Sequence, residues 1–232
     1  MSNKPGGLLF VFGQCEPAVS IQDFNDWYDG EHAPARLTVP GITSAVRYKS
    51  TDEQKPDWLA IYDLASPETL KSDAYLALRD KASDNEKAIV PRLPVLQRRA
   101  YSLINEVVKP DLPPDTLPGK HLLVVLWSVP KELDAELHEW YDKEHTSDIA
   151  KVPGWLRARR YKLVDGTDIA GKGPSMEGFD YLVLHEWDRD GYLKAPEFIE
   201  ACKTPWSVKV IGGANACIFR EFILYKNFEK QV

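Results

Sequence analysis

Apolar and polar positions in the first third of the chain predict a strand followed by an amphipathic helix. Residues 8–12 (Leu-Leu-Phe-Val-Phe) are continuously apolar, which predicts a buried strand. From Ser20 to about Arg36, the apolar side chains recur at helical spacing on one face. Ser20 followed by Asp23 is typical of a helix start, because a serine hydroxyl can accept a bond from a free N–H group of the first turn.

The same pattern predicts three more strands and a second helix before residue 105. Residues 42–49 and 58–64 predict strands, and Ser66-Pro67 predicts a helix start, since proline suits the first helical turn. Residues 95–104 predict the last strand. The predicted order is that of the ferredoxin-like βαββαβ unit. Such a unit has helices on one face of its sheet only, so its other apolar face needs a cover.

The pattern then repeats. The hexapeptide Trp-Tyr-Asp-Gly-Glu-His at 27–32 recurs as Trp-Tyr-Asp-Lys-Glu-His at 140–145, an offset of 113 residues. Two tripeptides recur at the same offset: Val-Pro-Gly at 39–41 and 152–154, and Arg-Tyr-Lys at 47–49 and 160–162. The third strand recurs at an offset of 123, because the second copy has ten extra residues within 165–178. That stretch is rich in glycine and small polar residues, and we interpret it as a loop. An internal repeat of this length predicts two copies of one structural unit.

Prolines mark the boundary between the copies. Four of them, Pro110, Pro113, Pro114 and Pro118, lie within residues 105–119. Because proline fixes φ and lacks an N–H group, they predict a stiff, extended linker. We therefore predict a first ferredoxin-like α/β-barrel unit over residues 1–104, a Pro-rich linker over 105–119 and a second unit over 120–232. The predicted fold class is α+β, with two tandem βαββαβ units packed sheet-to-sheet as a pseudo-dimeric α/β barrel.

Composition narrows the possible partners. Hydrophobic residues make up 44% of the chain and charged residues 28%, as in an ordinary globular protein. The formal net charge of −6 argues against nucleic-acid binding, which needs a basic surface. No apolar stretch is long enough to span a membrane or to act as a secretion signal, so we expect no membrane partner and a cytoplasmic location. The three cysteines are widely spaced, which favours free thiols.

The repeated helix motif, followed by Val-Pro-Gly and an Arg-Tyr strand, resembles the EthD-like branch of the dimeric α/β-barrel superfamily. The resemblance covers residues 7–104 and 120–226. Most relatives are single units that dimerise, so this chain is similar to a fused tandem pair. The resemblance implies a cofactor-free decarboxylase, cyclase or isomerase that acts on an aromatic or polyketide-like compound. Quinone-forming monooxygenases and some haem proteins share the wider fold, so the fold does not settle the function.

The repeated histidines are the first candidates for chemistry. His32 follows Tyr28 by one helical turn, and His145 follows Tyr141 in the same way, so a phenol and an imidazole can meet. An imidazole titrates near neutral pH and can move a proton in either direction. Because both copies carry the histidine, a structural role explains it equally well. In that role it would cap helix carbonyls or bond the Val-Pro-Gly loop.

Differences between the copies favour the second half as the active one. On the third strand, Tyr62 of the first copy is replaced by His185, which is either a partner base for His145 or a solvent-facing strand residue. Arg47 and Arg160 are either clamps for a substrate carboxylate or phenolate, or partners in surface ion pairs. Several tryptophans of the second half could wall a cavity for a flat aromatic ligand: Trp127, Trp155, Trp187 and Trp206.

These observations predict a cofactor-independent lyase or isomerase that decarboxylates, dehydrates or cyclises a small hydrophobic aromatic compound. His145, Tyr141 and His185 are predicted to act as acid and base, and His32 and Tyr28 form the corresponding first-half site. The predicted substrate contacts are Arg160, Arg47, Trp155, Trp187 and Tyr62. The alternatives are a cofactor-free monooxygenase of an aromatic substrate and a non-catalytic binding or auxiliary protein.

No metal ion, haem or other cofactor is predicted. His138 and His145 lie two helical turns apart, but no carboxylate set completes a metal site around them. Haem ligation by His145 or His185 rests on analogy with the wider fold alone. Because a fused pair covers both of its sheets, the chain is predicted to act as a monomer with pseudo-two-fold symmetry or as a homo-oligomer.

Overall fold

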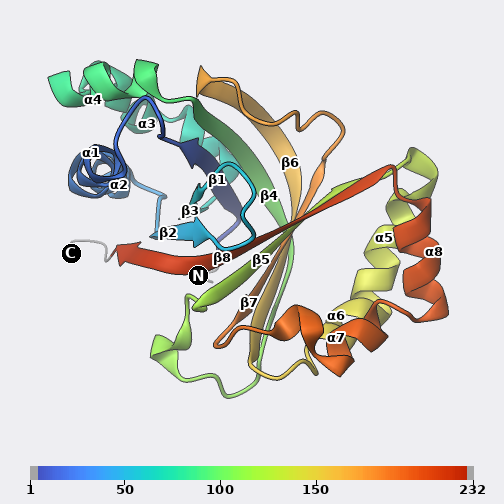
Figure 1. Cartoon of the computed structure of the whole chain (residues 1–232). Coiled ribbons are helices and arrows are strands. Elements are labelled where there is room, and N and C mark those ends of the chain that lie inside the picture. The colour runs from blue at the N-terminus through green and yellow to red at the C-terminus, as the bar shows by residue number, and fades with distance from the viewer. Residues whose placement is uncertain (1–4, 229–232) are drawn as a thin grey trace. The chain divides into compact units, whose positions relative to one another are not determined.

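The computed structural model describes residues 5–228, which divide into two compact units (Figure 1). The first unit comprises the described residues up to 103, together with 163–175 and 225–228. The second comprises residues 104–162 and 176–224. Segments from the second half of the sequence therefore belong to the first unit.

The first unit contains an antiparallel sheet in the order β4-β1-β3-β2. In its central strand, Phe10 pairs with Ile61 on one side and Arg99 on the other. The strands are β1 (Gly7–Gln14), β2 (Ala45–Ser50), β3 (Trp58–Leu64) and β4 (Val95–Val108). This order is the ferredoxin-like arrangement that the sequence pattern predicts.

The helices of the first unit pack on one face of this sheet (Figure 1). The first helix begins at Ser20, whose hydroxyl accepts a bond from the Asp23 N–H, as predicted. It runs through α1 (Ile21–Trp27), the π-helical turn η1 (Tyr28–His32) and α2 (Ala33–Leu37). The predicted second helix is instead a series of short ones, because Ser72 and Ser83 each cap a new start. These are η2 (Pro67–Lys71), α3 (Asp73–Asp80), α4 (Asp84–Ile89) and η3 (Val90–Arg92).

The second unit repeats this arrangement, with a sheet in the order β6-β7-β5-β8. Its strands are β5 (His121–Ser128), β6 (Trp155–Gly171), β7 (Tyr181–Trp187) and β8 (Ala216–Phe228). Its first helix runs through η5 (Lys131–Leu133), α5 (Asp134–Trp140), η6 (Tyr141–His145) and α6 (Thr146–Ile149). The later helices are η7 (Tyr192–Lys194), α7 (Pro196–Ala201) and α8 (Pro205–Gly213), and the short turn η4 (Pro114–Thr116) precedes β5.

Two elements extend beyond their predicted ends. Strand β4 continues to Val108, four residues past the predicted end, so the first part of the predicted linker is strand. Strand β6 continues to Gly171, so much of the segment that we interpreted as a loop is strand. The backbone hydrogen bonds of a sheet can hold a segment with polar side chains as a strand. The side-chain composition alone therefore gave the wrong prediction for this stretch. No helix in the described part of the chain is long and apolar enough to cross a membrane.

Each unit has its own apolar core between the helices and one face of the sheet. In the first unit, Leu9 and Val11 of β1 point to this side, because alternate strand residues share a face. Phe24, Trp27 and Tyr28 from the first helix pack against them. The second unit has an equivalent core that includes Trp127, Trp140, Tyr141, Trp155 and Trp187.

Candidate functional site

The repeated hexapeptide forms a π-helical turn in both units, η1 at Tyr28–His32 and η6 at Tyr141–His145. Single π-helical turns inside α-helices are rare and occur frequently at functional sites. The wider turn groups the aromatic side chains of the motif. The His32 ring lies 4.5 Å from the Trp27 ring and 4.7 Å from the Tyr28 ring, measured between ring centroids.

The aspartate of the motif holds the turn to the sheet. Asp29 forms an ion pair with Arg47 of β2, and Asp142 forms one with Arg160 of β6. The Arg47 side chain is only 2% exposed and is stacked among aromatic rings, including Tyr28 at 4.4 Å. Of the two interpretations of these arginines, the structure supports the ion pair. It is buried on the arginine side rather than lying at the surface.

The glutamate of the motif holds the next helix. Glu31 accepts hydrogen bonds from Ser83 and Asn85, and Glu144 accepts one from Thr204 at 2.6 Å. Ser83 and Thr204 are the N-cap residues of α4 and α8. The aspartate and glutamate therefore act on the fold in both units, and the histidine is where the two copies differ.

In the first unit, His32 is held by Glu86 of α4. The Nδ1 atom of His32 lies 3.2 Å from Oε1 of Glu86, and Trp27 Nε1 donates to the other carboxylate oxygen at 3.4 Å. Because an ionised carboxylate can only accept, we assign the ring proton to Nδ1. The Nε2 atom is then the basic nitrogen of the ring. Arg36, one turn later, donates to the His32 carbonyl at 2.9 Å.

The environment keeps the His32 imidazole uncharged at neutral pH. Burial lowers its pKa to about 3, and the guanidinium of Arg36 adds to this, while Glu86 opposes it. Burial alone would raise the pKa of Glu86, but the bond to His32 and the nearby charges lower it below its ordinary value. The pair is therefore a neutral imidazole on an ionised carboxylate. An anion placed beside the ring would favour its protonation.

His32 lies on the wall of a cavity of about 760 Å³ between the helices and the sheet of the first unit. That volume lies within the ~300–1,000 Å³ range of small-molecule pockets. Its apolar wall comes from β1, α3 and β4, and includes Leu9, Val11, Tyr75 and Leu96. The larger cavity therefore belongs to the first unit, whereas the sequence favoured the second half.

The extension of β6 forms part of the rim of this cavity. Asp168 and Ile169 line it, and Asp168 accepts a hydrogen bond from Gln97 of β4 at 2.9 Å. Asp165 of the same extension pairs with Arg98 of β4 at 3.0 Å. The ten extra residues of the second copy thus include part of the first unit's wall. The sequence shows the insertion but carries no sign of what it contacts.

Tyr28 and Tyr62, the tyrosines predicted for the first-half site, bond each other, and the Tyr28 ring packs on His32. Tyr62 donates to the Tyr28 hydroxyl at 3.1 Å, and both rings are buried. Burial raises the pKa of Tyr28, so it stays protonated at neutral pH. Neither tyrosine is among the described residues that line the cavity. Tyr28 therefore contacts His32 through its ring rather than reaching a ligand.

In the second unit, the equivalent site is almost filled. His145 and His185 are brought together on a cavity of only about 20 Å³, room for about one water molecule. His185 is 2% exposed, so the solvent-facing alternative for this residue is wrong. The His145 ring stacks on Trp140 at 3.9 Å. Among the described residues, the Nδ1 atoms of both histidines have no hydrogen-bond partner.

Substitutions explain why the second site is filled and uncharged. Ser207 stands where the first unit has Glu86, three residues after the N-cap, and accepts from Trp140 Nε1 at 3.1 Å. The other replacements at equivalent positions are Ile149 for Arg36 and Phe219 for Arg98, and both new side chains line the small cavity. Burial lowers the pKa of His145 and of His185 to about 3. The two imidazoles are therefore neutral.

The remaining predicted substrate contacts lie in packed surroundings. Trp187 stacks on Tyr192 at 4.1 Å, and Trp155 is buried in the core. Trp127 donates to the Tyr141 hydroxyl at 2.9 Å. Arg160 borders a void of about 10 Å³. The tryptophans of the second half thus fill its core and leave no space for an aromatic ligand among the described residues.

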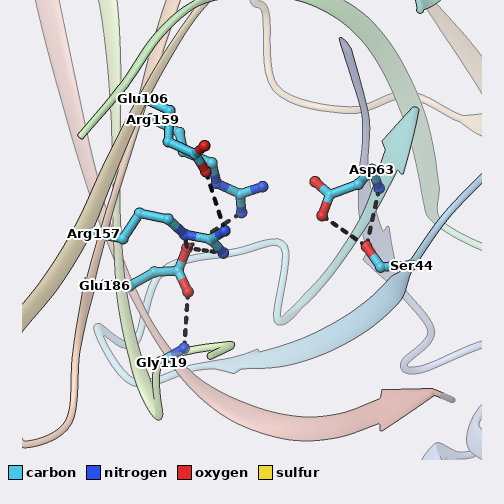
Figure 2. A network of polar contacts seen from close by, with 7 residues as sticks. All are labelled: Ser44, Asp63, Glu106, Gly119, Arg157, Arg159 and Glu186. Carbon is cyan, nitrogen blue, oxygen red and sulfur yellow. Dashed lines mark hydrogen bonds and ion pairs between the residues drawn. The ribbon is translucent and has the colours of Figure 1, made fainter. Parts of the chain in front are cut away.

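A buried charge network in the second unit escaped the sequence analysis. Figure 2 shows Glu186 of β7 accepting from Arg157, at 2.7 Å, and from the Gly119 N–H, at 2.8 Å, with Arg159 at 3.3 Å. Glu186 is fully buried. Burial alone would raise its pKa, but the two arginines lower it. Because its carboxylate is satisfied by these donors, the network supports the sheet. In the described chain, no group of three or more His, Cys, Asp or Glu side chains could hold a metal ion.

No model of a known protein family matches the sequence, and no curated protein matches it. Solved structures are similar in fold. An anthrone oxidase-like protein is 13% identical and has a TM-score of 0.66, with 99% of this chain and 94% of that chain covered. A candidate monooxygenase from Fusobacterium nucleatum is 11% identical and has a TM-score of 0.57, with 99% and 96% covered.

A third similar structure is a ferredoxin fold protein from Listeria monocytogenes that is related to antibiotic biosynthesis monooxygenases. It is 10% identical and has a TM-score of 0.50, with 96% of each chain covered. At these identities the likeness concerns the fold. It supports an α+β, ferredoxin-like fold, and membership of the dimeric α/β-barrel superfamily stays a prediction. The EthD-like branch and the sheet-to-sheet packing of a fused pair stay predictions.

Proposed function

We propose that the first unit is the active centre of a small-molecule enzyme in which His32 removes a proton from an aromatic or polyketide-like substrate. The observation that carries this proposal is the neutral His32 ring, fixed by Glu86 on the wall of a cavity of about 760 Å³. A neutral imidazole can accept a proton at Nε2, and the carboxylate on Nδ1 stabilises the resulting cation.

The cavity supports the second half of this step. Proton removal from a phenol or from an activated C–H group leaves an anion delocalised over the ring system. The guanidinium of Arg36 lowers the pKa of His32 in the empty site and would stabilise such an anion when it forms. The apolar side chains of the wall lower the local dielectric constant, which strengthens that interaction. The site is therefore suited to making a stabilised carbanion or phenolate without a bound cofactor.

Two reaction classes follow from the same anion. In a lyase or isomerase, the anion is reprotonated elsewhere or expels a leaving group, which gives decarboxylation, dehydration or cyclisation. In a monooxygenase, it reacts with O₂, and the resulting peroxide loses water to leave a carbonyl group. The second class is supported by the similar structures described as monooxygenases and as anthrone oxidase-like. Dependence on O₂ separates the two.

Hydrogen–deuterium exchange under argon tests the shared step. Anthrone is a suitable first probe, because its ring-activated CH₂ group exchanges protons through a stabilised anion. We expect the protein to accelerate exchange, His32→Gln to abolish the acceleration, and His145→Gln to retain it. Admission of O₂ would then show anthraquinone and water for an oxygenase. The proposal fails if a panel of anthrones, naphthols and hydroxynaphthoates binds but shows neither exchange nor turnover, the result expected of a non-catalytic binding protein.

A further inference from the structure

The wall of the first unit's cavity carries more positively charged than negatively charged side chains. Among the described residues that line it, the basic side chains outnumber the acidic ones: Arg36, Arg79, Lys87 and Arg98 against Glu86 and Asp168. Both acids are already engaged, Glu86 by His32 and Trp27, and Asp168 by Gln97. An apolar cavity with this excess of positive charge in a chain of net charge −6 calls for a ligand with its own negative charge.

Arg98 is placed to receive that charge. It lies two residues after Leu96 on β4, so both side chains point to the helix side of the sheet, where the cavity is. Its Nη2 atom pairs with Asp165, whose side chain is 58% exposed. Its Nε–H group is buried and has no hydrogen-bond partner among the described residues. A buried donor without a partner is costly, which indicates an acceptor supplied from outside the chain.

Comparison with the second unit shows that these cations are not required by the fold. Phe219 and Ile149 occupy the positions of Arg98 and Arg36, and they close the equivalent space to about 20 Å³. The same helices and strands therefore form without either arginine. The two guanidinium groups therefore go with the open cavity, although Arg36 also bonds the His32 carbonyl and Arg98 also pairs with Asp165.

From this arrangement we propose that the natural substrate is a flat aromatic compound carrying a carboxylate, which binds between Arg98 and Arg36 while the ring system lies against Leu9 and Leu96. This inference rests on the proposed function of the same site and names its substrate class. A guanidinium matches a carboxylate in shape and charge, and the cavity offers such donors from Arg98 on β4 and from Arg36 on α2. The carboxylate would orient the ring with its reactive position toward His32.

Binding of two matched probes tests the substrate class without any turnover. The carboxylate 2-naphthoate and the neutral amide 2-naphthamide have nearly the same shape, and titration calorimetry gives both affinities. We expect the carboxylate to bind at least about tenfold more tightly, and Arg98→Gln to remove most of that preference. Arg92→Gln is the matched control, because Arg92 carries the same charge but donates to the Ala18 carbonyl and is not among the cavity-lining residues. It should leave the preference unchanged.

The outcomes separate this inference from the proposed function. Equal affinity for the two probes in the wild-type protein overturns the carboxylate inference, even if His32-dependent proton exchange is observed. An equal loss of preference in the Arg98 and Arg92 variants also overturns it, since it would indicate only long-range charge. Conversely, an Arg98-dependent preference in a protein that exchanges no protons supports the carboxylate site and rejects the catalytic role. His32→Gln should lose exchange and keep the preference.

Discussion

The Nδ1 atom of His32 lies 3.2 Å from Oε1 of Glu86, whereas the same position opposite His145 is occupied by Ser207, which bonds Trp140 instead. One chain thus carries a histidine motif in two settings. In the first, the ring has a carboxylate partner and an open cavity. In the second, it is stacked in a filled core. Variants of the two settings serve as controls for one another.

Glu86→Gln should lower kcat about ten- to a hundredfold with little change in KM, the size of one hydrogen bond to a charged group. Glu86 acts here as a positioning residue, because it fixes the ring proton and stabilises the imidazolium that forms. The loss of its charge also lowers the pKa of His32 further, so the acid limb of the kcat–pH profile should move to lower pH. Ser207→Ala is the control. It should reduce stability but leave kcat and the profile unchanged.

Asp29→Asn should destabilise the protein more than Asp142→Asn does. Asp29 is 15% exposed and pairs with an Arg47 side chain that is 2% exposed, whereas Asp142 is 51% exposed. Breaking a buried pair costs up to about 3–5 kcal/mol, because the Arg47 charge would keep only its neutral partner Asn25, while an exposed partner is replaced by water at a cost of ~1 kcal/mol or less. Urea unfolding of both variants measures the difference. Equal losses would show that exposure of the aspartate does not set the strength of the pair.

The free energy of unfolding should fall as the pH drops below about 6.5, the pKa of a histidine in the unfolded chain. The pKa values of His32, His145 and His185 are each lowered to about 3, so the folded protein binds fewer protons than the unfolded chain from about pH 6.5 downward. Each of these buried groups contributes up to about 1.4 kcal/mol of lost stability per pH unit across that window. The stability is fully present above the unfolded pKa of ~6.5 and is lost as the pH falls toward 3.

Replacing one of these histidines isolates its share of that slope. His185→Gln should make the free energy of unfolding depend less steeply on pH between 6 and 4, because one buried proton-binding group is gone. Urea titrations at several pH values give the slope for each protein, so any constant change in stability cancels. If the slopes of the variant and the wild-type protein coincide, His185 is not held neutral by the fold.

Ile169→Ser should weaken binding of 2-naphthoate about three- to tenfold, as expected for the loss of roughly 1 kcal/mol of apolar contact. Ile169 lines the cavity from the β6 extension and is 51% exposed, so its loss should change stability little. Val164 lies on the same strand, is 47% exposed and is not among the cavity-lining residues. Val164→Ser should therefore bind like the wild-type protein, and an equal effect of both substitutions would contradict the assigned rim.

The local elements could be predicted because their signals are local. The Ser20 cap, the apolar run of β1 and the helical spacing up to Trp27 depend on neighbours along the chain. The pairing of His32 with Glu86 could not be predicted in this way, because the two residues are 54 positions apart and Glu86 lies on a polar helix with no unusual pattern. Comparison of the two copies could have indicated that their sites differ, since Glu86 is replaced by Ser207 and Arg36 by Ile149 in the second copy.

The sequence favoured the second half, but the larger cavity lies in the first unit, and this difference has a physical reason. Its extra tryptophans and histidine indicate an aromatic pocket only if space remains between them. The space left between packed side chains cannot be read from the residue types alone. Trp127, Trp140 and Phe198 fill the space instead. The charged residues of the first half mark the open cavity, because Arg36 and Arg98 line it, whereas Ile149 and Phe219 line the filled one.

The β6 extension, finally, makes the cavity of the first unit depend on the second half of the sequence. In a relative built from identical subunits, any insertion appears at both sites and must suit both. Here the ten extra residues occur once, and Asp165, Asp168 and Ile169 belong to the unit encoded mainly by the other half. A fragment ending at the proline-rich stretch would lack part of the wall of its own cavity, because Asp168 and Ile169 lie beyond that end. The sequence boundary between the two copies is therefore not the boundary between the two structural units.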